Sequence, residues 1–190
     1  FGLDAAGGVM RYLEERGIGV EVGEAHVPLV CQSCIFDLSV GQGGLRPDGG
    51  MAYAACASAG RTPLANGCVG GGTGATVGKY RGLGYAMKSG FGACAVQLGG
   101  LKVGAAVVVN ALGDVFDLDS GAQIAGLRTE DGAGLRSTEE EMWRDGERMG
   151  ALPGGNTTIG AVFTNGAFTK SQLGKIASMA HNGYARTIRP

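Results

Sequence analysis

Two apolar runs joined by a pair of glycines constrain the fold more than any other part of this chain. They read FGACAVQL over 91–98 and LKVGAAVVV over 101–109, with Gly99–Gly100 between them. Paired glycines supply the positive φ that a two-residue turn requires, so the segment predicts an antiparallel hairpin. Because nearly every position in both runs is apolar, we expect the hairpin to be buried on both faces.

Composition places the chain among globular proteins. Glycine supplies 38 of 190 residues without a collagen period, which indicates many tight turns and close backbone contacts. Hydrophobic residues make up 44% and charged residues 17%, and the net charge is -1. No Lys/Arg run alternates with aromatic residues, which argues against a nucleic-acid partner. Glycines interrupt the apolar stretches well before the ~18 residues that a membrane span needs, so we expect no membrane partner.

Cysteine usage favours a reducing compartment. The five cysteines are an odd number, and most have apolar neighbours, which is typical of free thiols. No secretory signal begins the chain, so a cytoplasmic location is expected. Cys31 and Cys34 form a lone C-x-x-C without a second pair or a histidine at ligand spacing, so we expect core packing in preference to a metal site or a redox dithiol.

Helix and strand patterns together predict a layered α/β domain. An amphipathic helix is expected at 3–16, and a second, well-marked helix follows Thr169, which forms a capping box with Gln172. A further helix cap is expected at Ser137. The other predicted elements are strands within 20–30, 34–40 and 157–165 and a small-residue helix at 51–59. Neither end resembles a natural terminus, so we interpret 1–190 as a single domain that is an incomplete fragment of a longer one.

A polar, glycine-rich segment at 117–155 leads directly into an apolar strand, and the junction carries the strongest chemical signal. It reads GGNTTIG, with Asn156 before the junction and Thr157 at the first strand position. A threonine hydroxyl there can attack the preceding carbonyl and give an ester that water hydrolyses. Cleavage leaves Thr157 with a free α-amine, which can act as the base that activates the hydroxyl. The alternative is an ordinary loop-to-strand junction.

The glycine-rich loop NGCVGGGTGATVGK at 66–79 also suggests nucleotide binding. A phosphate-binding loop needs glycine at 73 and serine or threonine at 80 around Gly78–Lys79. This chain has Thr73 and Tyr80, so the phosphate cradle and the magnesium hydroxyl are both missing. We therefore expect no nucleotide, and the sequence implies no metal and no other cofactor.

The chain resembles the L-aminopeptidase/D-esterase family of self-processing hydrolases over essentially its whole length. The resemblance is carried by FGLDAAGGVM, RYLEERGIG, NGCVGGGTGATVGK and GNTTIGAVFTNGAFTKSQLGKIASMAHNGYARTIRP. Within that family, VPLVCQSCIFDLSVG and the Asn–Thr junction are most similar to the nylon-oligomer endo-hydrolases, which cut 6-aminohexanoate oligomers. The resemblance implies an αββα sandwich of the N-terminal-nucleophile kind. It also implies autocleavage into pieces 1–156 and 157–190, which stay together and assemble into homo-oligomers of heterodimers.

The resemblance also implies the site residues. Thr157 matches the nucleophile, Asn156–Thr157 the processed bond, and Lys79 and Asn110 the family's catalytic lysine and amide. A Lys79 cation would disfavour a second positive charge and lower the pKa of the α-amine, ordinarily ~7.7–8.0. The Asn110 amide could donate to the oxyanion, an interaction typically worth ~10²–10³ in rate. From the residues alone, Lys79 could be a solvated loop lysine and Asn110 a turn former.

Two departures from the family pattern and two alternative functions remain. Phe36 stands where the family often has a tyrosine whose hydroxyl assists at the oxyanion. The acidic pair that supports the nucleophile in the nylon-oligomer hydrolases is expected beyond Pro190.

The expected substrate is a small linear amide oligomer of the 6-aminohexanoate kind, cut endo-wise. One alternative is an aminopeptidase, β-peptidyl aminopeptidase or D-esterase of the same family. The other is a non-catalytic binding module that stays uncut. His26 and His181 suggest no catalytic triad.

Overall fold

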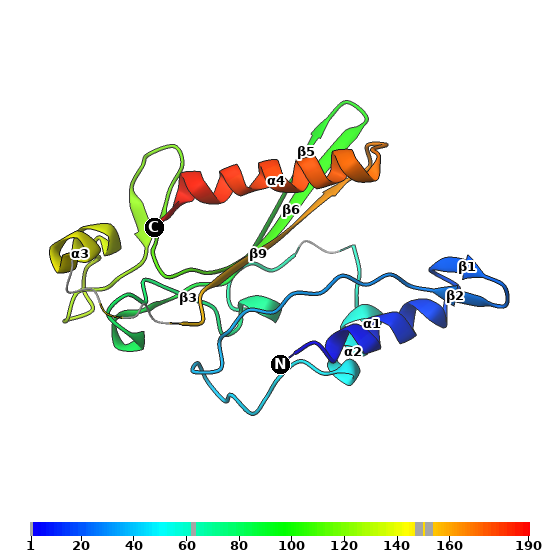
Figure 1. The fold of residues 1–190 in the computed structure, drawn as a ribbon, viewed down its shortest axis with the longest axis horizontal. Coiled ribbons are helices and arrows are strands. Elements are labelled where there is room, and N and C mark those ends of the chain that lie inside the picture. The colour runs from blue at the N-terminus through cyan, green and yellow to red at the C-terminus, as the bar shows by residue number, and fades with distance from the viewer. Residues whose placement is uncertain (1, 62–63, 147–149, 151–153) are drawn as a thin grey trace. The chain divides into compact units, whose positions relative to one another are not determined.

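The computed structural model describes residues 2–61, 64–146, 150 and 154–190, which form a mixed α/β structure (Figure 1). These residues fall into two compact units. The first combines Phe1–Cys34 with Gly41–Pro63, and the second combines Ile35–Val40 with Leu64–Pro190. The α/β class predicted from the sequence is therefore confirmed, and all of the predicted site residues belong to the second unit.

The first unit is a pair of helices with a small hairpin. Its elements are α1 (Ala5–Glu14), β1 (Val20–Val22), β2 (Ala25–Val27) and α2 (Gly49–Ala57), and β1 pairs antiparallel with β2. The helices approach closely at Gly8, where a Cβ would collide with the Gly49 carbonyl. Asp48 caps α2 by accepting a hydrogen bond from the Met51 amide at 2.8 Å. Both helices confirm the sequence predictions within two residues at each end.

The second unit is built on a three-stranded antiparallel sheet. Its strands are β5 (Phe91–Leu98), β6 (Leu101–Asn110) and β9 (Thr157–Thr164), in the order β5-β6-β9. Leu98 lies opposite Leu101 across the Gly99–Gly100 turn, and Gly99 has φ +58, so the predicted hairpin is confirmed. The sheet places the long central strand β6 beside the strand that begins at Thr157.

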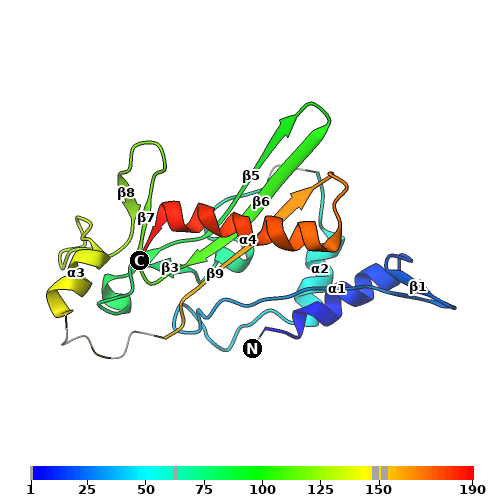
Figure 2. The ribbon, with the colours of Figure 1, turned by 45° about the horizontal axis from the view of Figure 1, so that its top comes forward.

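A long helix covers one face of this sheet. Helix α4 (Lys170–Thr187) lies across the strands in both ribbon views (Figures 1 and 2). Thr169 and Gln172 form the predicted capping box at its start. The helix packs closely against Gly160, where a side chain would collide with the Tyr184 hydroxyl. A small residue is therefore required in β9 beneath α4.

The glycine-rich loop covers the opposite face near the end of β6. Its short helix η1 (Gly70–Gly72) brings the backbone so close that a Cβ on Gly71 would lie 3.1 Å from the Val108 side chain. The loop continues into β3 (Thr76–Val77), which pairs with β4 (Met87–Lys88) beyond η2 (Leu83–Tyr85). Ala75, Val77 and Leu127 are fully buried, so the core of this unit lies beside the glycine-rich loop.

The remaining elements surround that core. Strands β7 (Asp114–Phe116), β8 (Gln123–Ala125) and β10 (Ile188–Arg189) form a second sheet in the order β10-β7-β8, and helix α3 (Thr138–Asp145) follows β8 (Figure 2). Ser137 caps α3 by accepting from the Glu140 amide at 3.2 Å. The Glu140 side chain pairs with Arg144 at 3.3 Å. The cap predicted at Ser137 is thus confirmed.

Three sequence expectations are corrected. Residues 34–40 form no strand, although the pattern predicted one. The hairpin is not buried on both faces, since Val96 is 65% and Leu98 82% exposed. Cys31 is exposed and does not pack in a core.

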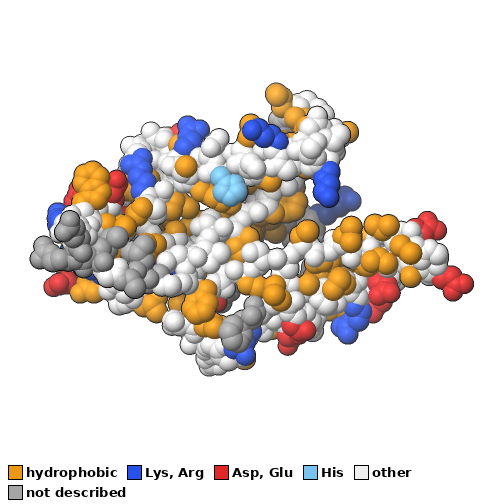
Figure 3. Space-filling model, in the orientation of Figure 1, with side chains coloured by type: hydrophobic (Ala, Val, Ile, Leu, Met, Phe, Trp, Pro, Cys, Tyr) orange, Lys and Arg blue, Asp and Glu red, His pale blue; other side chains and the backbone are white. Residues whose placement is uncertain are grey.

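Figure 3 shows hydrophobic side chains distributed over much of the face it presents. Among the described residues, no helix has the length and hydropathy needed to cross a membrane.

Candidate active site

Lys79 is held at the end of the glycine-rich loop by backbone hydrogen bonds. The amide of Gly78 donates to the Gly113 carbonyl and that of Lys79 to the Leu112 carbonyl, each at 2.8 Å. Gly78 has φ +66, and a side chain there would collide with the backbone at Gly126. The lysine itself is only 6% exposed, so its interpretation as a solvated loop residue is wrong.

The Lys79 ammonium donates to neutral amide oxygens. Its Nζ lies 3.0 Å from the Asn110 carbonyl oxygen, 2.9 Å from Asn110 Oδ1 and 3.4 Å from the Gly155 carbonyl oxygen. Burial lowers the pKa of Lys79 from 10.5 to about 8, and the negative charge of Asp37 limits the fall. Near neutral pH a useful fraction of Lys79 can therefore give up its proton.

Asn110 ends strand β6 and is 1% exposed. Its Oδ1 accepts hydrogen bonds from Lys79 and, at 3.0 Å, from the Thr76 amide. These donors fix the orientation of the side chain, so that its Nδ2 faces the other way. Nδ2 donates to the carbonyl oxygens of Phe36 and Gly155, each at 3.0 Å. Asn110 is thus an oriented hydrogen-bond donor and not a turn former.

Thr157 lies directly opposite Asn110 in the ladder between β6 and β9. Residues paired in this way point to the same face of an antiparallel sheet, with Cβ atoms about 4.5–5.5 Å apart. The Thr157 hydroxyl therefore lies on the side of the sheet that carries the Asn110 amide and the Lys79 ammonium. The register places the residues predicted as nucleophile, amide donor and lysine together.

The chain approaching Thr157 is held in the same place. The carbonyl oxygen of Gly155 accepts from both Lys79 Nζ and Asn110 Nδ2. This carbonyl precedes that of Asn156, the one that Thr157 would attack, by one residue. Gly155 has φ +88, and a Cβ on it would lie 2.5 Å from Cδ1 of Phe36. Phe36 is thus beside the site, where the family resemblance placed it, and it brings a ring without a hydroxyl.

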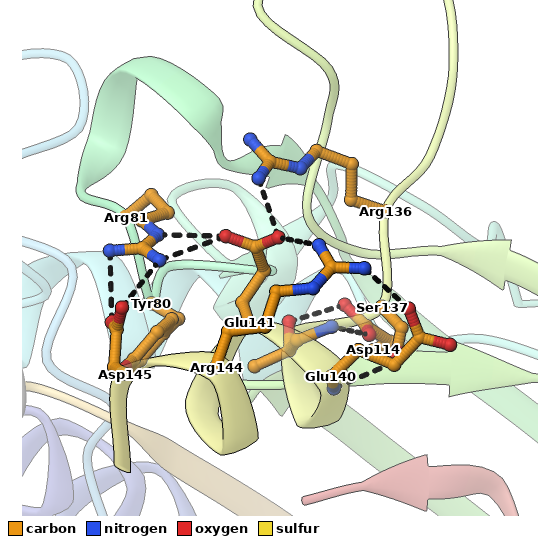
Figure 4. Close-up of polar contacts among 10 residues, drawn as sticks. Tyr80, Arg81, Asp114, Arg136, Ser137, Glu140, Glu141, Arg144 and Asp145 are labelled. Atoms are coloured by element: carbon orange, nitrogen blue, oxygen red, sulfur yellow. Dashed lines mark hydrogen bonds and ion pairs between the residues drawn. The ribbon is translucent and has the colours of Figure 1, made fainter. Parts of the chain in front are cut away.

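A cluster of charged side chains attaches α3 to the turn that follows Lys79 (Figure 4). Glu141 is 2% exposed and pairs with Arg81 at 2.9 Å, Arg136 at 2.5 Å and Arg144 at 2.7 Å. Arg81 also pairs with Asp145 at 2.9 Å. The Gly82 amide donates to the Lys79 carbonyl at 2.8 Å, so Arg81 lies within a turn that begins at the lysine.

The electrostatics of this cluster keep Glu141 ionised. Burial alone would raise the pKa of Glu141, but hydrogen bonds from Arg136 and Arg81 outweigh it, and the pKa is lowered. At the start of α3, the buried Asp114 carboxylate accepts from the Thr138 amide at 2.6 Å and from the Thr138 hydroxyl at 2.7 Å. The helix is therefore fixed both to β7 and to the turn after Lys79.

Sequence reasoning missed several residues of this arrangement. Asp37 lies against Gly74, which leaves no space for a side chain, and supplies the charge that acts on Lys79. Thr76 and Gly155 contribute backbone groups, which no residue pattern identifies. His181 is exposed on α4, and His26 lies in β2 of the other unit. Among the described residues, no group of three acidic, histidine or cysteine side chains could hold a metal ion.

Comparison with known proteins identifies the family of this chain. The profile of peptidase family S58 matches residues 1–190. The chain belongs to peptidase family S58. The family resemblance inferred from the sequence is thereby confirmed.

Curated relatives differ in their names. An uncharacterized aminopeptidase of Mycobacterium bovis is 40% identical over 197 residues, covering 100% of this chain and 54% of the relative. One of Mycobacterium leprae is 37% identical, with 100% and 53% covered. A 6-aminohexanoate-oligomer endohydrolase of Kocuria sp. is 28% identical over 191 residues, with 100% and 53% covered. The chain thus spans about half the length of the curated relatives it matches.

Proposed function

We propose that this S58 family member is a self-cleaving amide hydrolase whose nucleophile is Thr157. The single observation that carries the proposal is the register of β6 and β9, which pairs Thr157 with Asn110. Lys79 is bonded to the same asparagine, and both side chains hold the chain just before the predicted cut.

The first reaction is intramolecular. Thr157 Oγ attacks the carbonyl carbon of Asn156, the bond from that carbon to the Thr157 nitrogen breaks, and the hydroxyl proton passes to the nitrogen. The product is an ester between Asn156 and Thr157 Oγ. Water then hydrolyses the ester, leaving a carboxylate on Asn156 and a free α-amine on Thr157.

The uncut chain needs a base other than the α-amine, because that nitrogen is still part of an amide. Lys79 suits this role, since burial has brought its pKa to about 8. Its proton-accepting form is available near neutral pH, and it already contacts the Gly155 carbonyl. We assign the first proton transfer to Lys79.

Later turnovers use the new α-amine as the base. Thr157 Oγ attacks the substrate carbonyl, the amine part of the substrate leaves with a proton, and water releases the acyl part from Thr157. Lys79 in its charged form would disfavour protonation of the α-amine and so keep it basic. Asn110 would donate one of its amide hydrogens to the developing oxyanion.

The substrates proposed are linear amide oligomers of the 6-aminohexanoate kind, cut endo-wise, with no cofactor. The name of the Kocuria relative supports this choice. An aminopeptidase that releases single residues is the second candidate, and the higher identity with the mycobacterial aminopeptidases favours it. Product lengths from a defined oligomer separate the two, because an endo-hydrolase gives mixed oligomers.

The proposed assembly is an αββα sandwich that extends beyond this chain and associates into homo-oligomers of cleaved heterodimers in the cytoplasm. Apolar side chains exposed on the sheet, including Val96, Leu98 and Phe163, support the proposal that further protein covers the sheet in this assembly. All five cysteines are free, which accords with a reducing compartment.

Intact mass of the purified protein tests the proposal. The parent should give two pieces that meet between Asn156 and Thr157, Thr157→Ala should give one uncut chain, and Thr157→Ser should again give two. If Thr157→Ala gives the same two pieces as the parent, Thr157 is not the nucleophile of self-cleavage. A parent that stays uncut yet binds amide oligomers would identify a non-catalytic binding module.

A further inference from the structure

The segment Gly155–Asn156, just before the predicted cut, indicates how the site binds the acyl side of a substrate. In self-cleavage, Asn156 supplies the acyl group that Thr157 receives, and in turnover the substrate supplies it to the same oxygen. The chain on the acyl side of the cut therefore lies where the acyl side of a substrate has to lie. Gly155 marks the second acyl unit, counted away from the cleaved bond.

The site provides two donors for the carbonyl of that second unit. Lys79 Nζ lies 3.4 Å and Asn110 Nδ2 lies 3.0 Å from the Gly155 carbonyl oxygen. Both side chains are buried, so a substrate that lacks this carbonyl takes one acceptor away from each of them, which costs free energy. A substrate with a free amine at this position offers no carbonyl and brings a positive charge close to Lys79.

The same place excludes a side chain on the second unit. Gly155 has φ +88, a conformation that glycine adopts without strain and L side chains rarely adopt. A Cβ there would also lie 2.5 Å from Cδ1 and 3.2 Å from Cε1 of Phe36. The Phe36 ring therefore forms a wall against substituted units. An unbranched methylene chain meets the same condition as glycine.

We infer that Phe36 determines specificity by admitting only an unsubstituted second acyl unit, whose carbonyl accepts from Lys79 and Asn110. The inference rests on the proposed function, because it uses Thr157 as the acceptor of both acyl groups. It assigns as substrates acylated amide chains with a glycyl or unbranched unit in that position. Amides whose first acyl unit, the one with the attacked carbonyl, carries a free amino group in place of a second unit are poor substrates.

Three anilides test the substrate side of this inference: N-acetylglycyl-asparagine anilide, N-acetyl-L-alanyl-asparagine anilide and asparagine anilide. The first should have the highest kcat/KM. The second should be lower by about 10-fold or more, because one misplaced methyl group commonly has such an effect. The third should be lowest. Phe36→Ala should reduce the difference between the glycyl and alanyl substrates.

The chain's own cleavage tests the same subsite independently. Gly155→Ala should slow self-cleavage, whereas Gly154→Ala should not, because a Cβ added at Gly154 would meet no atom within 4 Å and Gly154 has no positive φ. Adding Phe36→Ala to Gly155→Ala should restore part of the rate, since it removes the collision and leaves the backbone strain.

Several results would overturn the inference. These are equal or faster cleavage of asparagine anilide, equal cleavage of the glycyl and alanyl substrates, and equal self-cleavage of the two glycine variants. Failure of a self-cleaved protein to hydrolyse any of the three anilides would also overturn it. A parent that never cuts itself would instead refute the proposed function, so the two failures are distinguishable.

Discussion

We expect the rate of self-cleavage to rise with pH as Lys79 loses its proton. The perturbation is a change of pH from 6 to 8 on the uncut protein, in which the α-amine of Thr157 does not yet exist. Burial gives Lys79 a pKa of about 8, lower than that of an exposed lysine. The neutral lysine is the form that can take the Thr157 hydroxyl proton.

The size of the effect follows from that pKa. About 1% of Lys79 is neutral at pH 6 and about half at pH 8, so the rate should rise by about 50-fold between them. If the base were an unperturbed lysine with a pKa of ~10.4, the rate of self-cleavage would still increase about tenfold per pH unit at pH 9. A rate that levels off above pH 8 is therefore specific to a buried lysine.

Cell-free synthesis at low pH, followed by a jump to each test pH, provides uncut protein, and intact mass follows the loss of the full-length chain. Lys79→Arg is the matched control, because arginine keeps the charge but does not deprotonate in this range. It should cut slowly at every pH. A parent rate that is constant between pH 6 and 8, or an arginine variant with the parent's profile, would refute Lys79 as the base.

Three further predictions follow from the same contacts. Asn110→Asp removes both amide donors, so the rate of self-cleavage, followed by intact mass, should fall by about 10²–10³. The new carboxylate should also raise the pKa of Lys79 and shift the pH profile of the rate upward. An unchanged rate would contradict the role of Asn110. Glu141→Gln leaves three partly exposed arginines without their shared carboxylate and should lower the free energy of unfolding by about 1–3 kcal/mol. Glu140→Gln, at an exposed pair, should lower it by less than ~1 kcal/mol, and equal denaturant midpoints would refute the distinction. Gly78→Ala should destabilise more than Gly82→Ala, because both have positive φ but only the first collides with backbone; thermal unfolding of the two variants decides it.

Local signals in the sequence predicted local structure well. The capping box at Thr169 and the turn at Gly99–Gly100 depend on residues a few positions apart, and both occur as expected. The strand predicted at 34–40 does not form, because these residues pair with no neighbouring strand and the Phe36 carbonyl accepts from the Asn110 side chain instead. Burial of the hairpin could not be judged from its own residues, since it depends on what else covers the sheet.

The site was predicted only in part. The junction residues indicated Thr157, and the resemblance indicated Lys79 and Asn110. The pairing that brings Thr157 to Asn110 depends on a ladder between strands far apart in the chain. The burial of Lys79 depends on backbone contacts at Leu112 and Gly113, which no residue type encodes. The role of Gly155 lies in its carbonyl and its φ, so it leaves no chemical signal in the sequence.

The register between β6 and β9 also determines where this sheet tolerates changes in length. A residue inserted within Ile159–Phe163 must be accommodated as a bulge, or it moves Thr157 by about 3.3 Å and turns its hydroxyl to the α4 face. Residues added at Gly99–Gly100 lengthen the hairpin at its far end and leave the pairing of Asn110 with Thr157 unchanged. That turn is therefore the place to insert a tag or a reporter peptide when self-cleavage has to be preserved.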